Sequence, residues 1–498
     1  MNKEKSPGFL GHAATYAAAN VARRFVGFAM LPIYTRFLTP ADYGVIGLLM
    51  FALAVFEPIF GARLGYALVK YYAEESSERA KREVIWGALV VTGSVSAVGT
   101  LLLILLRGIG SEMLFGDQKY ALALGIFAVN LLSRPLEENG MLVLQMNKRS
   151  RAFLQISMTK LMFQVVLNVL LVVVYRMGVV GVVLSGAISS SALALGITYY
   201  LFRTEPPVLN WSVSKKMIEY CWPLWFAGLA GLYIAAAGGV YLRVFGNLSE
   251  VGRLELALRF SSVVGLLIWA PFSQHWSPMS YQYFKDGSGK VKFQAAFIGI
   301  AILMISGGLG ISIFAGSVIQ VMATKPFYAA AELVPILVLG VVLNYLRSFF
   351  DFSFLVTDNT KISGMCQYAT VAIITVAYLT LVPRYHAIGV VLAQFVALSA
   401  SFLYTWILSR RYFDPEFDIG TVMVLLLTGI ICFLCAGRFA MHRDFVVSFI
   451  GRAIIWAVGT ILIFYIGVRK IKRIEAAFLD KLPWPLNKFG GVDFVREL

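Results

Sequence analysis

Charge is scarce in this chain of 498 residues, since Asp, Glu, Lys and Arg together make up 14% of it, against about 25% in ordinary soluble domains. Hydrophobic residues make up 59%. A soluble protein could not hide so much apolar side chain, because its surface also needs polar cover. The shortage of charge therefore excludes an ordinary soluble domain and predicts an integral membrane protein.

Cysteine is equally scarce, and its placement favours no redox or metal chemistry. All four cysteines lie in apolar stretches, without a histidine or a second cysteine pair at zinc spacing; they are Cys221, Cys366, Cys432 and Cys435. We interpret them as small apolar helix residues. The sequence therefore predicts no metal site and no cofactor.

Enzyme motifs are missing as well. The pair Gly289-Lys290 is followed by Val291 rather than Ser or Thr, and Phe284 stands where the first glycine of a P-loop belongs. Neither H-E-x-x-H nor G-x-S-x-G occurs. We therefore expect a transporter rather than an enzyme, and one that does not hydrolyse ATP in the P-loop manner.

Acidic residues are outnumbered, with 27 Asp and Glu against 43 Lys and Arg, for a net charge of +16. In a soluble protein this excess would suggest nucleic acid. Here it falls in alternate short loops, as the positive-inside rule expects, so we expect no nucleic-acid partner. The basic loops, which we place in the cytoplasm with both termini, contain Lys3 and Lys5; Lys70, Arg79, Lys81 and Arg82; Lys148, Arg149 and Arg151; Lys215 and Lys216; Lys285, Lys290 and Lys292; Arg410 and Arg411; and Arg469, Lys470, Lys472 and Arg473.

Long apolar segments are what the chain has in abundance. A bilayer core of about 30 Å needs about 20 helical residues, and segments of this length begin near residues 10, 43, 84, 120, 153, 179, 218, 253, 294, 328, 363, 387, 419 and 446. The sequence therefore predicts an all-α integral membrane protein with about 14 transmembrane helices.

The chain also contains signs of an internal repeat. Gly181-Val182-Val183-Leu184 recurs as Gly389-Val390-Val391-Leu392, an offset of 208 residues, and Asp42 and Gly44 match Glu250 and Gly252 at that same offset. Repeats of this kind commonly place a substrate site between them, near the midplane. We expect an N-lobe of six spans over residues 1–204, a cytoplasmic linker over 205–216, a C-lobe of six spans over 217–412, two further spans over 413–470 and a cytoplasmic tail over 471–498.

Ionisable groups within the spans are candidates for function. A charge at mid-bilayer costs about 2.5 to 3.5 kcal/mol on insertion scales, so these groups must pair or line water inside the bundle. Arginine offers a planar fork of donors that suits phosphate. We predict a substrate-binding cavity lined by Arg23, Arg24, Arg63, Arg134, Arg259 and Arg347, with ion-coupling candidates Glu57, Glu137, Glu138 and Asp351. Structural ion pairs are the alternative, because Arg134 precedes Glu137 and Glu138, and Arg347 precedes Asp351, by three or four residues.

A longer motif carries a family resemblance. Residues 31–44, Leu-Pro-Ile-Tyr-Thr-Arg-Phe-Leu-Thr-Pro-Ala-Asp-Tyr-Gly, resemble the P-x-x-T-R-x-L-[ST]-P-x-[ED]-Y-G opening of Wzx-like polysaccharide-biosynthesis flippases. These flippases are members of the multidrug/oligosaccharidyl-lipid/polysaccharide exporter superfamily. Residues 247–252 repeat the motif weakly as Asn-Leu-Ser-Glu-Val-Gly.

The resemblance implies two six-helix lobes in a V arrangement that open alternately to either side of the bacterial cytoplasmic membrane. The implied partners are an oligosaccharide on undecaprenyl pyrophosphate, membrane lipids, and a polymerase or other polysaccharide-assembly proteins. Lipid II flippases of the same superfamily are similar in span number, and their arginines in spans 1 and 8 correspond in span position to Arg23, Arg24 and Arg259. A lipid II flippase and a multidrug or cation antiporter stay open as alternatives, as does a membrane scaffold that transports nothing.

Overall fold

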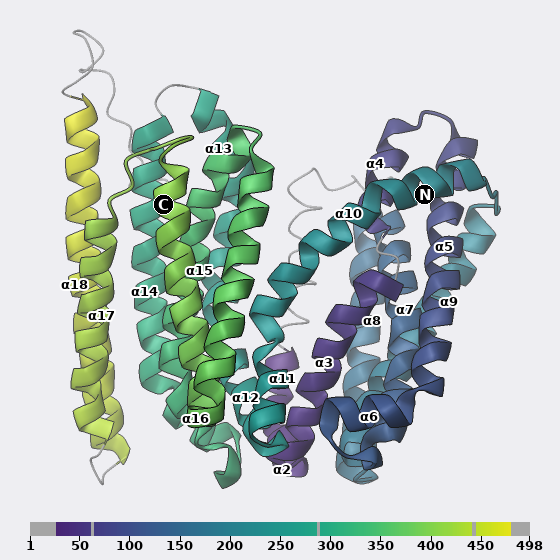
Figure 1. The fold of residues 1–498 in the computed structure, drawn as a ribbon, viewed down its shortest axis with the longest axis horizontal. Helices are drawn as coiled ribbons and strands as arrows, with labels where there is room; N and C mark the ends of the chain where they lie inside the picture. Colours follow the sequence, from purple (N-terminus) through teal and green to yellow (C-terminus); the bar gives the residue numbers. More distant parts are fainter. Residues whose placement is uncertain (1–25, 61–63, 286–288, 441–444, 480–498) are drawn as a thin grey trace, which may run out of the picture. The chain divides into compact units, whose positions relative to one another are not determined.

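The computed structural model describes residues 26–60, 64–285, 289–440 and 445–479, and every regular element in these ranges is a helix. The first half of the chain contains α2 (Leu31–Phe37), α3 (Pro40–Phe60), α4 (Gly65–Glu74), α5 (Glu78–Leu105), α6 (Arg107–Phe115), η1 (Gln118–Tyr120), α7 (Ala121–Met146), α8 (Ser150–Asn168), η2 (Val169–Val174), α9 (Gly178–Thr204), α10 (Trp211–Ala236) and α11 (Gly238–Phe245). The second half contains α12 (Leu248–Val264), η3 (Gly265–Trp269), α13 (Ala270–Lys285), α14 (Gly289–Met322), η4 (Lys325–Phe327), α15 (Ala330–Val356), α16 (Thr360–Ser409), α17 (Ile419–Ala440) and α18 (Phe445–Leu479) (Figure 1).

These helices confirm the all-α membrane fold. Ten of them, among the described residues, are long and apolar enough to cross a bilayer, or eleven if the bent pair α10 and α11 forms one span. The 50-residue α16 is interrupted at His386, where φ is 49°, so it accommodates both spans predicted from residues 363 and 387. Helix α7 is as long as a span but carries three charges. The first predicted span lies largely outside the described residues. The predicted count of 14 spans is compatible with the helices that the structure describes.

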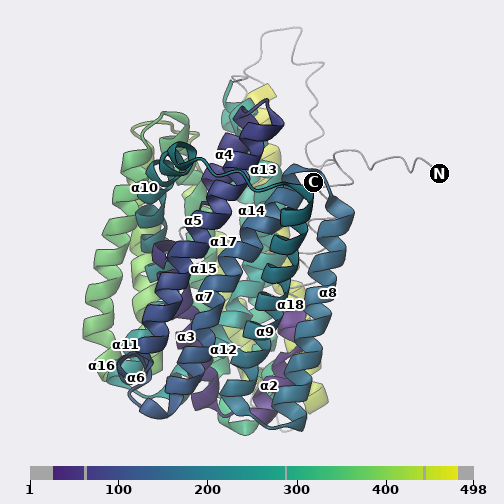
Figure 2. The ribbon, with the colours of Figure 1, turned by 90° about the vertical axis from the view of Figure 1, so that its right-hand side faces the viewer.

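Packing divides the chain into two compact units. Unit 1 runs up to Glu255 and includes Met322–Phe327, whereas unit 2 contains Leu256–Val321 and everything from Tyr328 onwards. Unit 1 has a core of apolar side chains from α4, α5, α7, α9 and α10, which includes Trp86, Met217 and Cys221. The helices that contribute them are labelled in Figure 2. In unit 2, α17 and α18 pack along one another (Figure 1). The lobe, linker and tail boundaries given above stay predictions.

Three connections of unit 1 meet at one end of its helices. The hydroxyl of Tyr72 donates to Asn147 at 2.6 Å, which joins the end of α4 to the turn between α7 and α8. Arg82 Nε lies 3.1 Å from Glu205 Oε2, and the indole N–H of Trp86 donates to the Glu205 carbonyl at 2.8 Å. The loops before α5, after α7 and after α9 therefore share one end, as their common basic character predicts.

Unit 2 shows the same clustering of predicted cytoplasmic loops. Lys290, at the start of α14, lies 3.3 Å from Glu416, and Gln294 donates to the carbonyl of Pro415 at 2.7 Å. The ammonium of Lys470 reaches Asp418 at 2.6 Å. Burial alone would raise the pKa of Asp418, but hydrogen bonds from Lys470 and Thr421 outweigh it and hold that pKa below its ordinary value.

The membrane orientation of these ends gives a testable prediction. We expect labelling from outside only at loops on the end opposite the basic clusters, because basic loops are retained in the cytoplasm. Single cysteines would be introduced and treated with an impermeant reagent in whole cells. Positions near Lys119 and Lys325 should react, and positions near Lys81, Lys148, Lys215 and Lys290 should not. Labelling near Lys148 without labelling near Lys119 would contradict the topology.

The repeated Asp42/Gly44 and Glu250/Gly252 motifs have the same structural role in α3 and α12. Each acidic residue bonds to the residue that precedes its helix. Asp42 forms a capping box, since it accepts the Thr39 N–H and hydroxyl at 3.0 and 2.8 Å. Glu250 accepts from the side-chain amide of Asn247 at 3.0 Å, and its own N–H donates to Asn247 Oδ1 at 3.0 Å. Each glycine then packs against the other helix. A Cβ on either glycine would lie 3.0 Å from the amide nitrogen of the other.

This crossing leaves no room for a side chain. A Cβ on Gly44 would overlap the carbonyl oxygen of Leu248, and one on Gly252 would overlap that of Pro40. Close backbone approach of this kind is available only to glycine. The starts of α3 and α12 are therefore held together by a reciprocal glycine contact, which explains why the repeat retains this residue.

The repeated Gly-Val-Val-Leu stretch, at residues 181–184 and 389–392, follows a break in the helices of each unit. Gly181 comes after the turn at Arg176 and Gly178, both with positive φ, and lies against the carbonyl of Leu171. Gly389 comes three residues after His386 and lies against the carbonyl of Leu381. Each glycine lets a new helix fold back closely on the one before it.

Candidate functional site

Helix α7 concentrates the polar groups of unit 1. Asn130, Ser133, Glu137 and Asn139 are buried on it, Arg134 is partly buried and Glu138 is exposed. Glu137 pairs with Lys160 of α8, whose ammonium lies 2.6 Å from its Oε1. The partner of Glu137 is thus on the next helix rather than at Arg134. Such a pair keeps both charges satisfied inside an apolar bundle.

A cavity of about 640 Å³ opens between α4 and α7 in unit 1. Its size lies within the range of about 300–1,000 Å³ that is usual for small-molecule sites. The lining combines apolar, aromatic, amide and charged side chains, contributed by Gly65, Tyr66, Val69, Lys70, Pro135, Glu138, Asn139 and Leu142. This mixture can hold a ligand that has both an apolar face and polar edges.

Unit 2 contains a charged cluster between α15 and α16. Arg347 Nη2 lies 3.3 Å from Asp351 Oδ2, which confirms the pairing that their spacing predicts, and both side chains are largely buried. The hydroxyl of Ser363 donates to the other Asp351 oxygen at 3.4 Å. The Nε and Nη1 of Arg347 are buried and have no hydrogen-bond partner in the described part of the chain. Buried donors nearly always have partners, so two unpartnered donors on a residue this well buried are unusual.

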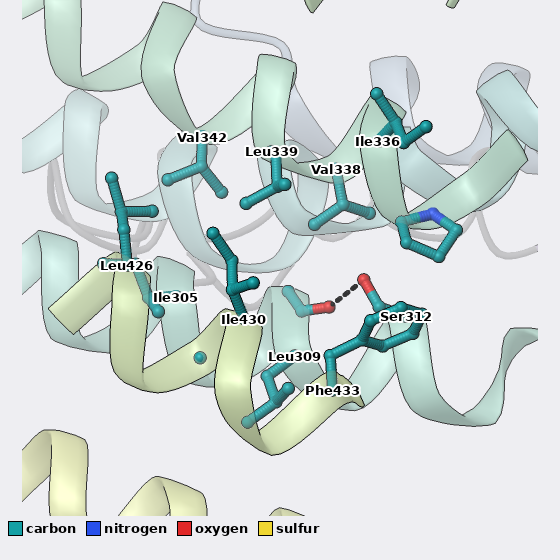
Figure 3. Close-up of a pocket in the computed structure, with 13 residues that line it drawn as sticks. Ile305, Leu309, Ser312, Ile336, Val338, Leu339, Val342, Leu426, Ile430 and Phe433 are labelled. Atoms are coloured by element: carbon teal, nitrogen blue, oxygen red, sulfur yellow. Dashed lines mark hydrogen bonds between the residues drawn. The ribbon is translucent and has the colours of Figure 1, made fainter. Parts of the chain in front are cut away.

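A second cavity, in unit 2, differs in character from the cavity of unit 1. It measures about 160 Å³ and lies among α14, α15 and α17, lined by side chains such as Leu309, Val338 and Ile430 (Figure 3). Ser312 is its one polar side chain among the described residues, and its hydroxyl donates to the Gly308 carbonyl at 2.8 Å. With that hydroxyl's proton already donated, the cavity has no free donor for a phosphate and suits hydrocarbon rather than a sugar.

Of the remaining predicted site residues, two are described by the structure and three lie outside the described residues. Glu57 is buried in α3 beside Pro58, and Arg259 is partly buried on α12 in unit 2. Arg23, Arg24 and Arg63 lie outside the described residues. Sequence reasoning missed Lys160, the partner of Glu137, because a lysine on a neighbouring span has no fixed spacing to reveal it.

Comparison with known proteins now decides the family. A family model described as "Polysaccharide biosynthesis protein" matches residues 10–284, more than half of the chain. This chain belongs to the polysaccharide biosynthesis protein family. The match covers all of the opening motif at residues 31–44, on which the resemblance was based. A comparison with curated proteins finds no significant match.

Solved structures show which fold this polysaccharide biosynthesis protein adopts. It resembles "Lipid II flippase MurJ, inward closed conformation" with a TM-score of 0.74 and 13% identity, over 90% of this chain and 98% of that one. It also resembles an inward-facing multidrug resistance MATE family transporter of the MOP superfamily, with a TM-score of 0.61 and 15% identity, over 79% and 94% of the two chains. The family member therefore has the multi-pass fold of this transporter superfamily.

Proposed function

We propose that the chain moves an oligosaccharide linked to undecaprenyl pyrophosphate from the cytoplasmic to the outer leaflet of the bacterial cytoplasmic membrane. It would do so by alternating access, and its termini would be cytoplasmic. The observation that carries the proposal is the buried Arg347, which retains two donors beside its Asp351 partner in a polysaccharide biosynthesis protein with a transporter fold. A guanidinium in such an environment is suited to an anionic oxygen.

The predicted site residues then divide into two roles. Arginines bind the pyrophosphate, since its oxygens match their planar donors; they are Arg23, Arg24, Arg63, Arg134, Arg259 and Arg347. Acidic residues couple transport to an ion gradient by binding a proton or Na⁺ within the bundle; they are Glu57, Glu137, Glu138 and Asp351. The pairing of Glu137 with Lys160 supports such a role, because neutralising the carboxylate would release the ammonium.

Cells that lack the protein provide the test. We expect a lipid-linked oligosaccharide to accumulate in the inner leaflet and export of the finished polysaccharide to stop, because no other step of the assembly is affected. The lipid-linked glycans would be extracted and identified by mass spectrometry, with the wild-type gene restored as the control. Unchanged export with no accumulated lipid-linked glycan would contradict the proposal.

A further inference from the structure

The cavity between α4 and α7 is distinct from the buried Arg347–Asp351 pair and from the apolar cavity of Figure 3. Helix α4 leads directly into the Glu75–Ser77 connection at the end where the basic loops of unit 1 meet. If that end faces the cytoplasm, as the loop charges predict, the cavity lies on the side from which a lipid-linked glycan enters.

Tyr66 gives the cavity an aromatic surface. Its side chain is 69% exposed although it lines the cavity together with Pro135 and Leu142. Large aromatic side chains contribute binding energy through contact with one flat face, and their hydroxyl stays available at the rim. The C–H face of a pyranose ring is a flat apolar surface of matching size, so a sugar can stack on Tyr66.

Asn139 and Lys70 supply polar groups next to that surface. The amide nitrogen of Asn139 donates to the hydroxyl of Thr92 at 3.0 Å, which fixes the amide and leaves its carbonyl oxygen as an acceptor toward Gly65. The ammonium of Lys70 lies 4.3 Å from the ring centre of Tyr220, a contact that holds its position without using its N–H donors. Donor and acceptor together match the hydroxyl groups on the edge of a sugar ring.

Gly65 keeps this space open. A Cβ at that position would lie 2.9 Å from Leu142 Cδ1 and 3.8 Å from Asn139 Oδ1. Any larger residue would therefore push into the wall of the cavity beside the Asn139 acceptor. Backbone conformation does not require this glycine, since it begins a regular helix; its small size leaves room for the Leu142 side chain.

We propose that this cavity binds one sugar ring, a hexose or an N-acetylhexosamine, of the lipid-linked oligosaccharide. Tyr66 stacks on the ring, Asn139 accepts from a hydroxyl and Lys70 donates to a second oxygen. The proposal rests on the proposed flippase function and adds a site that selects the glycan separately from the pyrophosphate.

Binding of defined lipids to the purified full-length protein in nanodiscs tests the proposal. The probes are undecaprenyl pyrophosphate and the same lipid carrying a single hexose or a single N-acetylhexosamine. We expect one of the sugars to strengthen binding of the lipid to the wild type. Tyr66→Ala should weaken binding of that sugar-carrying lipid about tenfold. Tyr66→Phe should retain it, because the stacking face remains. Tyr175→Ala is the matched control, since Tyr175 is also 64% exposed and does not line the cavity.

Each outcome has a definite meaning. Loss of the sugar-dependent gain in Tyr66→Ala, with unchanged affinity for undecaprenyl pyrophosphate, supports the subsite and shows that the variant is folded. An unchanged gain in Tyr66→Ala, or an equal loss in Tyr175→Ala, overturns the subsite. A wild type that binds the bare carrier and gains nothing from either sugar also overturns it, and leaves the flippase proposal standing. A wild type that binds none of the lipids removes the flippase proposal, and the subsite with it.

Discussion

Replacement of Gly252 with alanine is expected to destabilise the protein by about 3 kcal/mol or more and to abolish transport. The new methyl group would overlap the Pro40 carbonyl oxygen, and backbone cannot move aside as a flexible side chain can. The starts of α3 and α12 must therefore separate. Thermal unfolding of the purified variant in detergent measures the loss.

The reciprocal geometry makes a sharper prediction for Gly44. Gly44→Ala should cost a similar amount, and the double variant should cost clearly less than the two single effects added, because one separation of the helices relieves both clashes. Gly196→Ala is the matched control, since its Cβ would meet nothing within 4 Å on α9 and alanine favours a helix. Additive losses, or a stable Gly252→Ala, would show that the helices are not in this contact.

Replacement of Arg347 with alanine is expected to abolish transport. It removes the proposed phosphate donor and leaves Asp351 buried without its partner, a situation that costs about 3–5 kcal/mol in comparable pairs. Loss of folding could therefore imitate loss of function. Arg347→Lys separates the two, because it keeps the charge and removes the planar fork. We expect it to fold and to transport poorly, as measured by flux per folded protein.

The double variant Arg347→Gln/Asp351→Asn completes the test. Both side chains are then neutral, so the protein should regain stability while transport stays lost. Recovery of transport in this double variant would show that Arg347 serves only to balance Asp351 and has no contact with the substrate.

The sequence predicted the features that depend on hydrophobicity and repetition. Predicted span starts near residues 120, 153, 179 and 419 lie within three residues of the starts of α7, α8, α9 and α17, because a run of apolar residues must be helical in a bilayer. The repeat of Gly44 as Gly252 was visible in the sequence because the two glycines are separated by the same 208 residues as the other repeated stretch. Its structural cause is the close contact between these two glycines. Arg347 and Asp351 paired as expected, since residues four apart on one helix share a face.

Features that depend on contacts between helices could not be predicted. Lys160 and Glu137 are 23 residues apart, and only the packing of α8 on α7 brings them together. The cavity between α4 and α7 arises from residues around 65–70 and 135–142, none of which forms a recognisable motif. Tyr66 in particular looks like any aromatic residue of an apolar span until the opposing helix is in place.

Flipping by the purified protein in sealed vesicles tests the central claim most directly. The vesicles would carry undecaprenyl pyrophosphate linked to the glycan that accumulates in cells lacking the protein, and an impermeant reagent would report its appearance in the opposite leaflet. We expect transfer without ATP, accelerated by a potential that is negative on the starting side, since each elementary charge crossing 100 mV gains about 2.3 kcal/mol. Transfer that needs ATP and ignores the potential and the ion gradients, or no transfer above that in protein-free vesicles, would contradict the account.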